Sequence, residues 1–385
     1  MPHADVIAHG AHVMTVCNAC RYCEQYCPVF PAMESRLTFA AADLTYLANL
    51  CHNCGECLYA CQYAPPHEFG INVPRTMAEI RAHSYEAYCW PSFLSSAFRH
   101  HNLLTGIALA AGLIAVMITA VLIANGGVFP RPVGPGDFYG VLPHDVMVVL
   151  FGAVFVFVVV AIGIGVTRFW RDIRRGEAHR PTAADLSRAL GDVLTLRHLH
   201  ANGADCTSAE EQRAPLRRWF HHCTFYGFLL CCASTSVAAI YHSVFEWLAP
   251  YPFGSFPVLL GMAGGAGLLI GPAGLLMLRT ERDAALGDPD QRGLDESFTA
   301  LLFVTSLTGF LLLAFRERAV MSAFLVVHLG AVLALFVTLP YGKFVHGIYR
   351  TAALIQYAIT SSSSSHRVAG TVTIQEGPAN STAIR

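Results

Sequence analysis

The sequence predicts a mainly α-helical protein in which a small N-terminal domain precedes a bundle of transmembrane helices. Three observations lead to this fold class. Cysteines cluster in the first 61 residues, long apolar runs follow from residue 103 onward, and charged residues make up only 13% of the 385-residue chain. An ordinary soluble domain carries about 25% charged residues. Most of this chain is therefore expected to lie in lipid.

The cysteines near the N-terminus form one pattern twice, C-x2-C-x2-C-x3-C. The first run is Cys17, Cys20, Cys23 and Cys27, and the second is Cys51, Cys54, Cys57 and Cys61. This is the ligand spacing of a bacterial-type ferredoxin module with two [4Fe-4S] clusters, in which the fourth cysteine of each run binds the other cluster. The spacing predicts two ligand sets: Cys17, Cys20, Cys23 and Cys61 on one cluster, and Cys51, Cys54, Cys57 and Cys27 on the other.

Zinc and disulfides are the alternative uses of such cysteines, and the spacing favours neither. Zinc sites usually pair two C-x2-C knuckles and need no third cysteine at the same spacing. A disulfide framework is typical of small secreted proteins, and the first 90 residues lack the apolar segment of a signal peptide. Pro28 follows Cys27 as the ferredoxin pattern expects, whereas Gln62 replaces the second proline. That departure affects a turn and no ligand.

Six apolar runs follow, each near the ~20 residues that a helix needs to cross a hydrocarbon core. We expect them at Leu103–Ala124, Val146–Val166, Phe220–Ile240, Phe256–Met277, Phe298–Ala314 and Val320–Leu339. The fifth run is the shortest, so five spans is the fallback count. Glycines in the fourth run, among them Gly264, Gly267 and Gly271, are expected to form a close packing face for a neighbouring helix.

The runs divide the chain into three parts. Residues 1–95 form the cluster domain, residues 96–350 the transmembrane domain of about six helices, and residues 351–385, with five consecutive serines, a mostly disordered tail. A short amphipathic helix is expected around Ala183–Leu199, in the loop between the second and third spans. The net charge of −1, without a basic and aromatic patch, argues against nucleic-acid binding.

The basic residues predict the orientation of the chain. They flank the spans mainly after the second, fourth and sixth runs and before the third. Positively charged flanks mark the cytoplasmic side of a membrane. Because an even number of spans returns the chain to the side from which it started, both the cluster domain and the C-terminus are expected on the cytoplasmic side of a bacterial inner membrane.

Histidines at the ends of two spans are candidate axial ligands of b-type haem. Ionisable residues in spans are functional candidates, imidazole is a common haem ligand, and no C-x-x-C-H attachment sequence occurs. If the third and sixth spans are antiparallel, His221 or His222 pairs with His346 on the cytoplasmic side. His242 then pairs with His328 on the outer side. The sequence leaves open whether one haem or two is bound.

Helical spacing indicates which of these histidines lie on the same face of a helix. His328 and His346 are 18 residues apart, so one continuous helix would carry both on the same face, roughly 27 Å apart. His242 lies about 60° off the face of His221 but nearly opposite His222. The spacing therefore favours His221, with His222 as the alternative.

Other residues near the span ends have less specific interpretations. His101 and His144, at the starts of the first and second spans, are alternative haem ligands. Lys343 and Arg350, near the end of the sixth, are interpreted as phospholipid anchors.

Two stretches carry a resemblance to known proteins. The last apolar run ends in F-V-T-L-P-Y-G-K-F-V-H-G-I-Y-R, which resembles the haem-bearing last helix of the membrane subunits (gamma-type) of respiratory nitrate reductases and heterodisulfide-reductase-like complexes. The second cysteine run continues C-x2-C-G-E-C-L-Y-A-C-Q-Y-A-P-P-H-E-F-G-I-N-V-P-R. With about six spans behind it, the chain resembles the tricarballylate (citrate) utilization protein B family from about residue 16 to residue 355.

The resemblance implies a membrane electron-transfer protein. It implies that the chain is similar to an electron-transfer partner of a soluble FAD-dependent dehydrogenase, which oxidises tricarballylate to cis-aconitate. The electrons from that oxidation are then expected to pass through two [4Fe-4S] clusters and haem b to the membrane quinone pool. A related protein, fused to such a flavoprotein, is associated with cobalamin biosynthesis. The substrate of the partner dehydrogenase therefore stays open. The eight cluster cysteines match the family pattern one by one, whereas the haem ligands match firmly only at His328 and His346.

The residues themselves favour electron relay over chemistry on an organic substrate. The chain has no dinucleotide fingerprint and no arrangement of a nucleophile with a base. It is expected to be an electron-transfer subunit of an oxidoreductase. Two other functions are compatible with the same features: a membrane-anchored redox sensor that docks a partner, and a subunit that oxidises quinol for a reductase.

Overall fold

The computed structural model describes residues 3–94, 103–124, 136–175, 179–199 and 209–371. Within these ranges the protein is mainly helical and contains no β-strand. Its α-helices are α1 (His3–Cys20), α2 (Val29–Glu34), α3 (Ala41–Leu50), α4 (Glu56–Tyr59), α5 (Val73–Tyr88), α7 (Leu103–Ala124), α8 (Phe138–Val141), α9 (His144–Ile173), α10 (Ala183–Leu194), α11 (Ala209–Phe245), α12 (Phe256–Thr280), α13 (Arg292–Phe315), α14 (Met321–Thr338) and α15 (Val345–Thr371).

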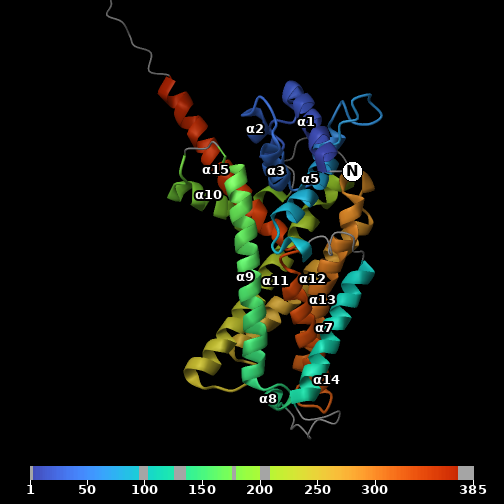
Figure 1. The fold of residues 1–385 in the computed structure, drawn as a ribbon, viewed down its shortest axis with the longest axis vertical. Helices are drawn as coiled ribbons and strands as arrows, with labels where there is room; N and C mark the ends of the chain where they lie inside the picture. The colour runs from blue at the N-terminus through green and yellow to red at the C-terminus, as the bar shows by residue number, and fades with distance from the viewer. Residues whose placement is uncertain (1–2, 95–102, 125–135, 176–178, 200–208, 372–385) are drawn as a thin grey trace, which may run out of the picture.

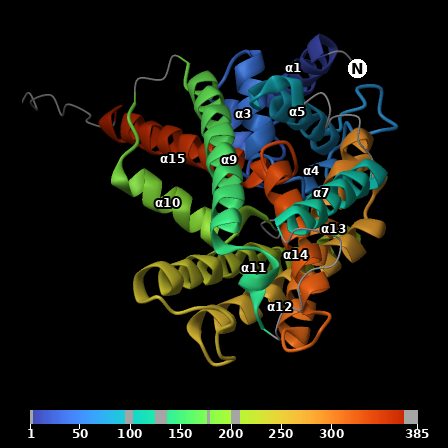
Figure 2. The ribbon, with the colours of Figure 1, turned by 60° about the horizontal axis from the view of Figure 1, so that its bottom comes forward.

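The helices form an elongated molecule with the N-terminal helices α1 to α5 at one end (Figure 1). α10 and α15 lie at this same end, and the short α8 lies at the opposite one. The long helices α7, α9, α13 and α14 connect the two ends, and Figure 2 shows α11 and α12 packed side by side below them. The cysteine-rich part of the chain is thus built onto one end of a helical bundle.

Five of the described helices are long and apolar enough to cross a membrane, which is consistent with a multi-pass membrane protein. They are His144–Ile173, Pro215–Phe245, Phe256–Thr280, Pro289–Phe315 and Met321–Thr338. The count agrees with the fallback of five. The first expected run forms α7, whose apolar stretch Ala111–Ile123 is shorter than the other five. Valines on α9 such as Val149 and Val156 are 71% and 60% exposed, as side chains that face lipid would be.

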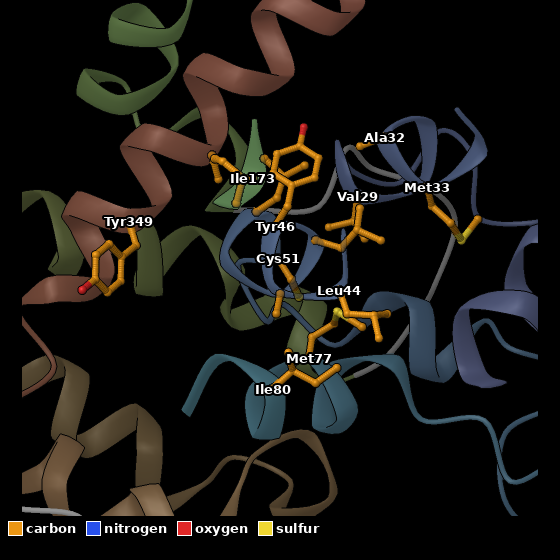
Figure 3. Close-up of a cluster of buried hydrophobic side chains, with 14 of the residues drawn as sticks. Val29, Ala32, Met33, Leu44, Tyr46, Cys51, Met77, Ile80, Ile173 and Tyr349 are labelled. Carbon is orange, nitrogen blue, oxygen red and sulfur yellow. The ribbon is translucent and has the colours of Figure 1, made fainter. Parts of the chain in front are cut away.

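The core of the N-terminal domain is made by α1, α3 and α5. Leu44 and Met77 are fully buried in it, and Asn72 caps the start of α5, since its side chain accepts a hydrogen bond from the backbone of Arg75. Figure 3 shows that Ile173 and Tyr349 lie beside this cluster, although they come from α9 and α15. The N-terminal domain therefore shares its core with two segments from much later in the chain.

The amphipathic helix expected between the second and third spans is present. It is α10, followed by a 3₁₀ turn at Arg197–Leu199. Thr182 and Asp185 form a reciprocal capping box at its first turn. The helix packs against α15, so it lies at the same end of the molecule as the cysteines.

The glycines of α12 form the packing face that the sequence predicts. A Cβ atom at Gly267 would lie 2.7 Å from the carbonyl oxygen of Cys223, and one at Gly264 would lie 2.8 Å from that of Gly227. Both oxygens belong to the backbone of α11. Only glycine permits the two helices to approach this closely.

The expectation of one continuous helix carrying His328 and His346 is wrong. α14 ends at Thr338 and α15 begins at Val345. The carbonyl oxygen of Thr338 accepts hydrogen bonds from the backbone N–H groups of Tyr341 and Gly342, at 3.1 and 2.8 Å. These bonds close a turn around Pro340, which has no N–H to continue the helix.

The tail starts later than the sequence suggested. Residues 351–371, expected to be mostly disordered, continue α15, and Ala353, Gln356 and Ile359 are buried. The reason is tertiary: this part of α15 packs against α3 and α10. Residues 372–385 lie outside the described part of the chain.

Candidate functional site

Each cysteine run starts where a helix of the N-terminal domain ends. Cys17 and Cys20 lie in the last turn of α1, and Cys51 is the residue that caps α3. Gly55, within the second run, adopts a positive φ of 100°, a backbone conformation that glycine adopts without strain. Because both helices end at a run, the thiols of each run are carried on a turn that can wrap a cofactor.

The thiols of the first predicted ligand set lie near one another. The pKa of Cys17 is raised to about 12, first by burial and then by its thiol neighbours, which are Cys61, Cys23 and Cys20. In addition, the side-chain amide nitrogen of Gln62, Nε2, lies 3.7 Å from the sulfur of Cys20. The residue that replaces the expected proline thus links the end of the second run to the first run.

The second predicted set is gathered in the same way. Burial raises the pKa of Cys27, and the thiols that raise it further are Cys54 and Cys51. Burial also raises the pKa of Cys57, with contributions, in decreasing order, from Cys54, Cys51, Cys27 and Cys23. The fourth cysteine of each run therefore lies near cysteines of the other run.

This donor set fits [4Fe-4S] clusters better than a single metal ion. In the described part of the chain, no group of three or more His, Cys, Asp or Glu side chains lies close enough to hold one ion. A cubane binds each thiolate through a different iron atom, so its ligands lie further apart. The backbone N–H of Tyr63 also donates to the sulfur of Cys61, at 3.4 Å, and such bonds stabilise cluster thiolates.

Arginines from outside the second run hold the loop of residues 50–53. Each of the four consecutive carbonyl oxygens of this loop accepts a hydrogen bond from an arginine. Arg350 donates to the carbonyl of Leu50 and Arg81 to that of Cys51. Arg217 donates to the carbonyls of His52 and Asn53, and Arg282 also donates to that of Asn53. Three of these arginines come from later in the chain: Arg217 lies in α11, Arg282 follows α12 and Arg350 lies in α15. We call residues 50–53 the arginine-bound loop.

A cavity of about 270 Å³ lies between the arginine-bound loop and the membrane helices, just below the range of about 300–1,000 Å³ that is usual for ligand pockets. Cys54 and His52 line it from the N-terminal domain. Its other walls come from α11, α12, α13 and the segment that leads into α15, and they include His221, Leu275, Phe298, Leu302, Lys343 and His346.

The rings of His221 and His346 both line this cavity and lie edge to face. Their ring centroids are 6.0 Å apart and their planes differ by 71°. Two imidazoles on opposite sides of one iron, each with a metal–nitrogen bond of about 2 Å, place their ring centres about 6 Å apart. Nδ1 of His346 contacts the carbonyl oxygen of Lys343. Because a carbonyl only accepts, Nδ1 carries the proton and Nε2 keeps its lone pair for a metal.

His222 does not take part in this pair. Its ring stacks on Tyr226, with centroids 5.7 Å apart and planes 10° apart, and it does not line the cavity. Of the two candidates that the sequence left open, only His221 is beside His346. The preference for His221 from helical spacing agrees with this placement.

His328 packs against α13. Its Nδ1 lies 3.1 Å from the carbonyl oxygen of Thr305 and 3.1 Å from the hydroxyl of Thr308, and its ring covers Gly309. By the argument used for His346, Nδ1 carries the proton. The predicted partner of His328 is His242, but these contacts are with Thr305, Thr308 and Gly309 of α13.

His242 instead stacks on His144, with ring centroids 3.7 Å apart and planes 24° apart. Its Nδ1 is 3.4 Å from the hydroxyl of Tyr139. The His242–His328 pairing is wrong because α11 packs mainly on α12, whereas α14 packs on α7, α9 and α13. Rings stacked this closely leave no room for iron between them. His101, the other alternative, lies outside the described residues.

The interpretation of Lys343 and Arg350 as lipid anchors is also wrong. Nζ of Lys343 forms an ion pair with Asp295 at 2.9 Å, and Arg279 reaches the same carboxylate at 3.2 Å. Burial lowers the pKa of Lys343, and Asp295 opposes that shift. Arg350 binds the arginine-bound loop. Basic residues at span ends were assigned to the membrane surface, but here tertiary contacts turn them inward.

Comparisons with known proteins cover both parts of the chain. Residues 10–87 match a family model described as the citrate utilization protein B Fer4-like domain, and residues 98–367 match one described as citrate utilization protein B. A protein of Escherichia coli named citrate utilization protein B is 48% identical over 361 residues, which is 93% of this chain and 92% of that protein. No solved structure matches the chain. With a Fer4-like N-terminal domain and membrane-length helices behind it, this chain belongs to the citrate utilization protein B family.

Proposed function

We propose that the protein transfers electrons from a partner FAD-dependent dehydrogenase to the membrane quinone pool, with tricarballylate dehydrogenase as the partner. The Fer4-like domain and the family membership support an iron–sulfur role in citrate or tricarballylate utilization. The proposed cofactors are two [4Fe-4S] clusters and one haem b.

One observation carries this proposal: Cys54, His221 and His346 line the same cavity. A ligand of the second cluster and both axial ligands of the haem would therefore share one compartment. Iron–sulfur clusters and haem exchange single electrons, and such groups let a two-electron flavin donor reduce a quinone stepwise. A shared cavity would keep the path between them short.

The residues of the chain have separate roles in this scheme. The two cysteine sets hold the clusters, with Cys17, Cys20, Cys23 and Cys61 in one and Cys27, Cys51, Cys54 and Cys57 in the other. The carbonyl oxygen of Lys343 contacts Nδ1 of His346, which would leave Nε2 as the nitrogen that holds the iron. Hydrogen bonds to sulfur and nearby positive charge raise cluster potentials, and the arginine-bound loop supplies that charge beside the second set.

We place the N-terminal domain on the cytoplasmic side of a bacterial inner membrane. The basic residues Arg217, Arg279 and Arg282 lie at the end of the helical bundle that carries this domain, as the positive-inside rule expects. A soluble flavoprotein could then dock on the exposed face of the domain.

An anaerobic titration of the purified protein tests the proposal. Dithionite should produce two interacting cubane signals in electron paramagnetic resonance and a b-type haem spectrum, and a soluble quinone analogue should reoxidise the haem. Adding the dehydrogenase and its substrate should then support steady quinone reduction. Clusters without haem would contradict the haem assignment. Reduction of the cofactors by the dehydrogenase without sustained flux would indicate a redox sensor instead.

A further inference from the structure

Two buried side chains that line the cavity have no hydrogen-bond partner and are not used by the proposed function: Tyr85, through its hydroxyl, and His52, through both ring nitrogens. His52 is 4% exposed, and neither of its ring nitrogens has a hydrogen-bond partner. A buried polar group in this state costs free energy unless a ligand satisfies it. Since His52 lines the cavity, the missing partner is expected from whatever the cavity holds.

The backbone that carries His52 is held in place. Its carbonyl oxygen accepts a hydrogen bond from Arg217 at 3.1 Å, and that arginine also binds the next carbonyl. Arg81 binds the preceding one, at Cys51. A side chain on a backbone fixed at three successive positions is preorganised for a ligand.

The charge of the cavity selects for an anion. Six basic side chains line it, Arg81, Arg217, Arg279, Arg282, Lys343 and Arg350, against the two carboxylates Asp288 and Asp295. Asp295 is already bound by both Lys343 and Arg279. A pocket with an excess of cations favours a negatively charged ligand group, and hydrogen bonds to charged groups are the strong ones.

We propose that His52 donates a hydrogen bond to a carboxylate of the cavity's ligand, and that this carboxylate is a propionate of the porphyrin held by His221 and His346. The inference rests on the proposed function. A b-type porphyrin carries two carboxylates on one edge and is apolar elsewhere. The same cavity offers His52 and cationic groups for that edge and Leu275, Phe298 and Leu302 for the rest. His52 is therefore a positioning residue that fixes which edge of the porphyrin faces the second cluster.

The test compares two porphyrins on the full-length protein. The protein is produced in a haem-deficient host and titrated in detergent with ferric protoporphyrin or with its dimethyl ester, which lacks the carboxylates. The Soret band reports binding, and the cluster spectrum reports folding. The variants are His52→Phe, which has no donor, and His52→Gln, which keeps one. His12→Phe on the exposed face of α1 is the control.

The wild type and the control should bind the free acid at least about tenfold more tightly than the ester, the factor expected for a hydrogen bond to a charged group. His52→Phe should lower that ratio by about tenfold by weakening the free acid, with His52→Gln in between, because the cationic side chains of the cavity are unchanged. A wild-type ratio near one overturns the inference without any variant. An unchanged ratio in a folded His52→Phe protein also overturns it.

Two further outcomes separate the alternatives. If neither porphyrin binds the wild type, the haem site of the proposed function fails, and the inference fails with it. Free citrate is added to the haem-free protein as a second source of carboxylate. If it changes the cluster spectrum in the wild type but not in His52→Phe, and the porphyrin ratio is near one, His52 receives a free tricarboxylate and the propionate assignment is overturned.

Discussion

Nη1 of Arg217 lies 2.9 Å from the carbonyl oxygen of Asn53, across 164 residues of sequence. The bond joins the start of a membrane helix to the loop between the first two cysteines of the second run. It places a positive charge beside the predicted second cluster. Burial raises the pKa of Cys54, a member of the second predicted set, and Arg217 is among the groups that oppose that rise. The charge of Arg217 therefore acts on a ligand of the second predicted cluster.

Replacing Arg217 with Gln should lower the reduction potential of the second cluster and leave the first unchanged. Reduction adds negative charge to a cluster, and a nearby cation stabilises the reduced state. A redox titration followed by electron paramagnetic resonance measures both potentials. Arg197→Gln is the control, because Arg197 is 69% exposed and pairs with Asp192 at the surface. Equal shifts of both clusters, or none, would contradict the assignment.

Replacing His221 or His346 with Ala should abolish the b-type haem spectrum. Each variant leaves the iron with one axial ligand in the cavity. The neighbouring variant His222→Ala is the matched control and should retain the spectrum, since His222 stacks on Tyr226 outside the cavity. Pyridine haemochrome assays on the three purified proteins give the haem content. Haem lost from His222→Ala but kept in His221→Ala would reverse the ligand assignment.

Replacing Cys54 with Ser should remove or convert one cluster and stop electrons from reaching the haem. A serine hydroxyl is a poorer iron ligand than a thiolate, and Cys54 is the cluster cysteine that lines the cavity. Stopped-flow reduction of the haem by a flavoprotein donor is the measurement, with iron content recorded alongside. Cys223→Ser, on α11, should leave both unchanged. Haem reduction at the normal rate in Cys54→Ser would place this cluster off the path.

Replacing Gly267 with Ala should destabilise the membrane bundle by about 1–3 kcal/mol, the usual range for overpacking. The new methyl group would lie 2.7 Å from a backbone oxygen of α11, which has no flexible side chain to move aside. Gly163→Ala on α9 is the matched control, because nothing lies within 4 Å of its added Cβ. Thermal unfolding in the same detergent compares the two. A lower Tm for Gly163→Ala than for Gly267→Ala would argue against the packing face.

Replacing Asp295 with Asn should destabilise the protein by about 3 kcal/mol, because breaking a buried ion pair leaves charges without compensation. The carboxylate is 14% exposed, and its partners Lys343 and Arg279 are 25% and 30% exposed. The double variant Asp295→Asn/Lys343→Met should recover part of this loss, since it removes one of the stranded charges. Denaturant unfolding measures both proteins. A double variant less stable than the single one would show that Lys343 stabilises the fold by another route.

The local features of this chain were predictable from its sequence. The spacing within each cysteine run predicts thiolate ligands, and the two ligand sets stay a prediction. Apolar runs indicated membrane helices, and the glycines of α12 indicated a packing face. The cysteine spacing, the apolar runs and the glycines are patterns among residues that are close in sequence.

The features that depend on long-range contacts were not predictable in this way. Arg350 donates a hydrogen bond to the carbonyl of Leu50, 300 residues away in the sequence. The carbonyl of His52 accepts one from Arg217, 165 residues away. The pairing of His242 with His328 failed because it assumed which helices are neighbours. His52 did carry one signal in the sequence: it is the titratable residue between the first two cysteines of the second run.

The contribution of α15 to the N-terminal core has a consequence for biosynthesis. Val345, Tyr349 and Ala353 pack in the same cluster as Val13 and Leu44. The ribosome completes the cysteine runs first, but that cluster stays incomplete until these last helical residues emerge. Domains otherwise fold as units during synthesis. The core of the cysteine-bearing domain is therefore completed by the last helix, and the part of the chain that is made first is closed last.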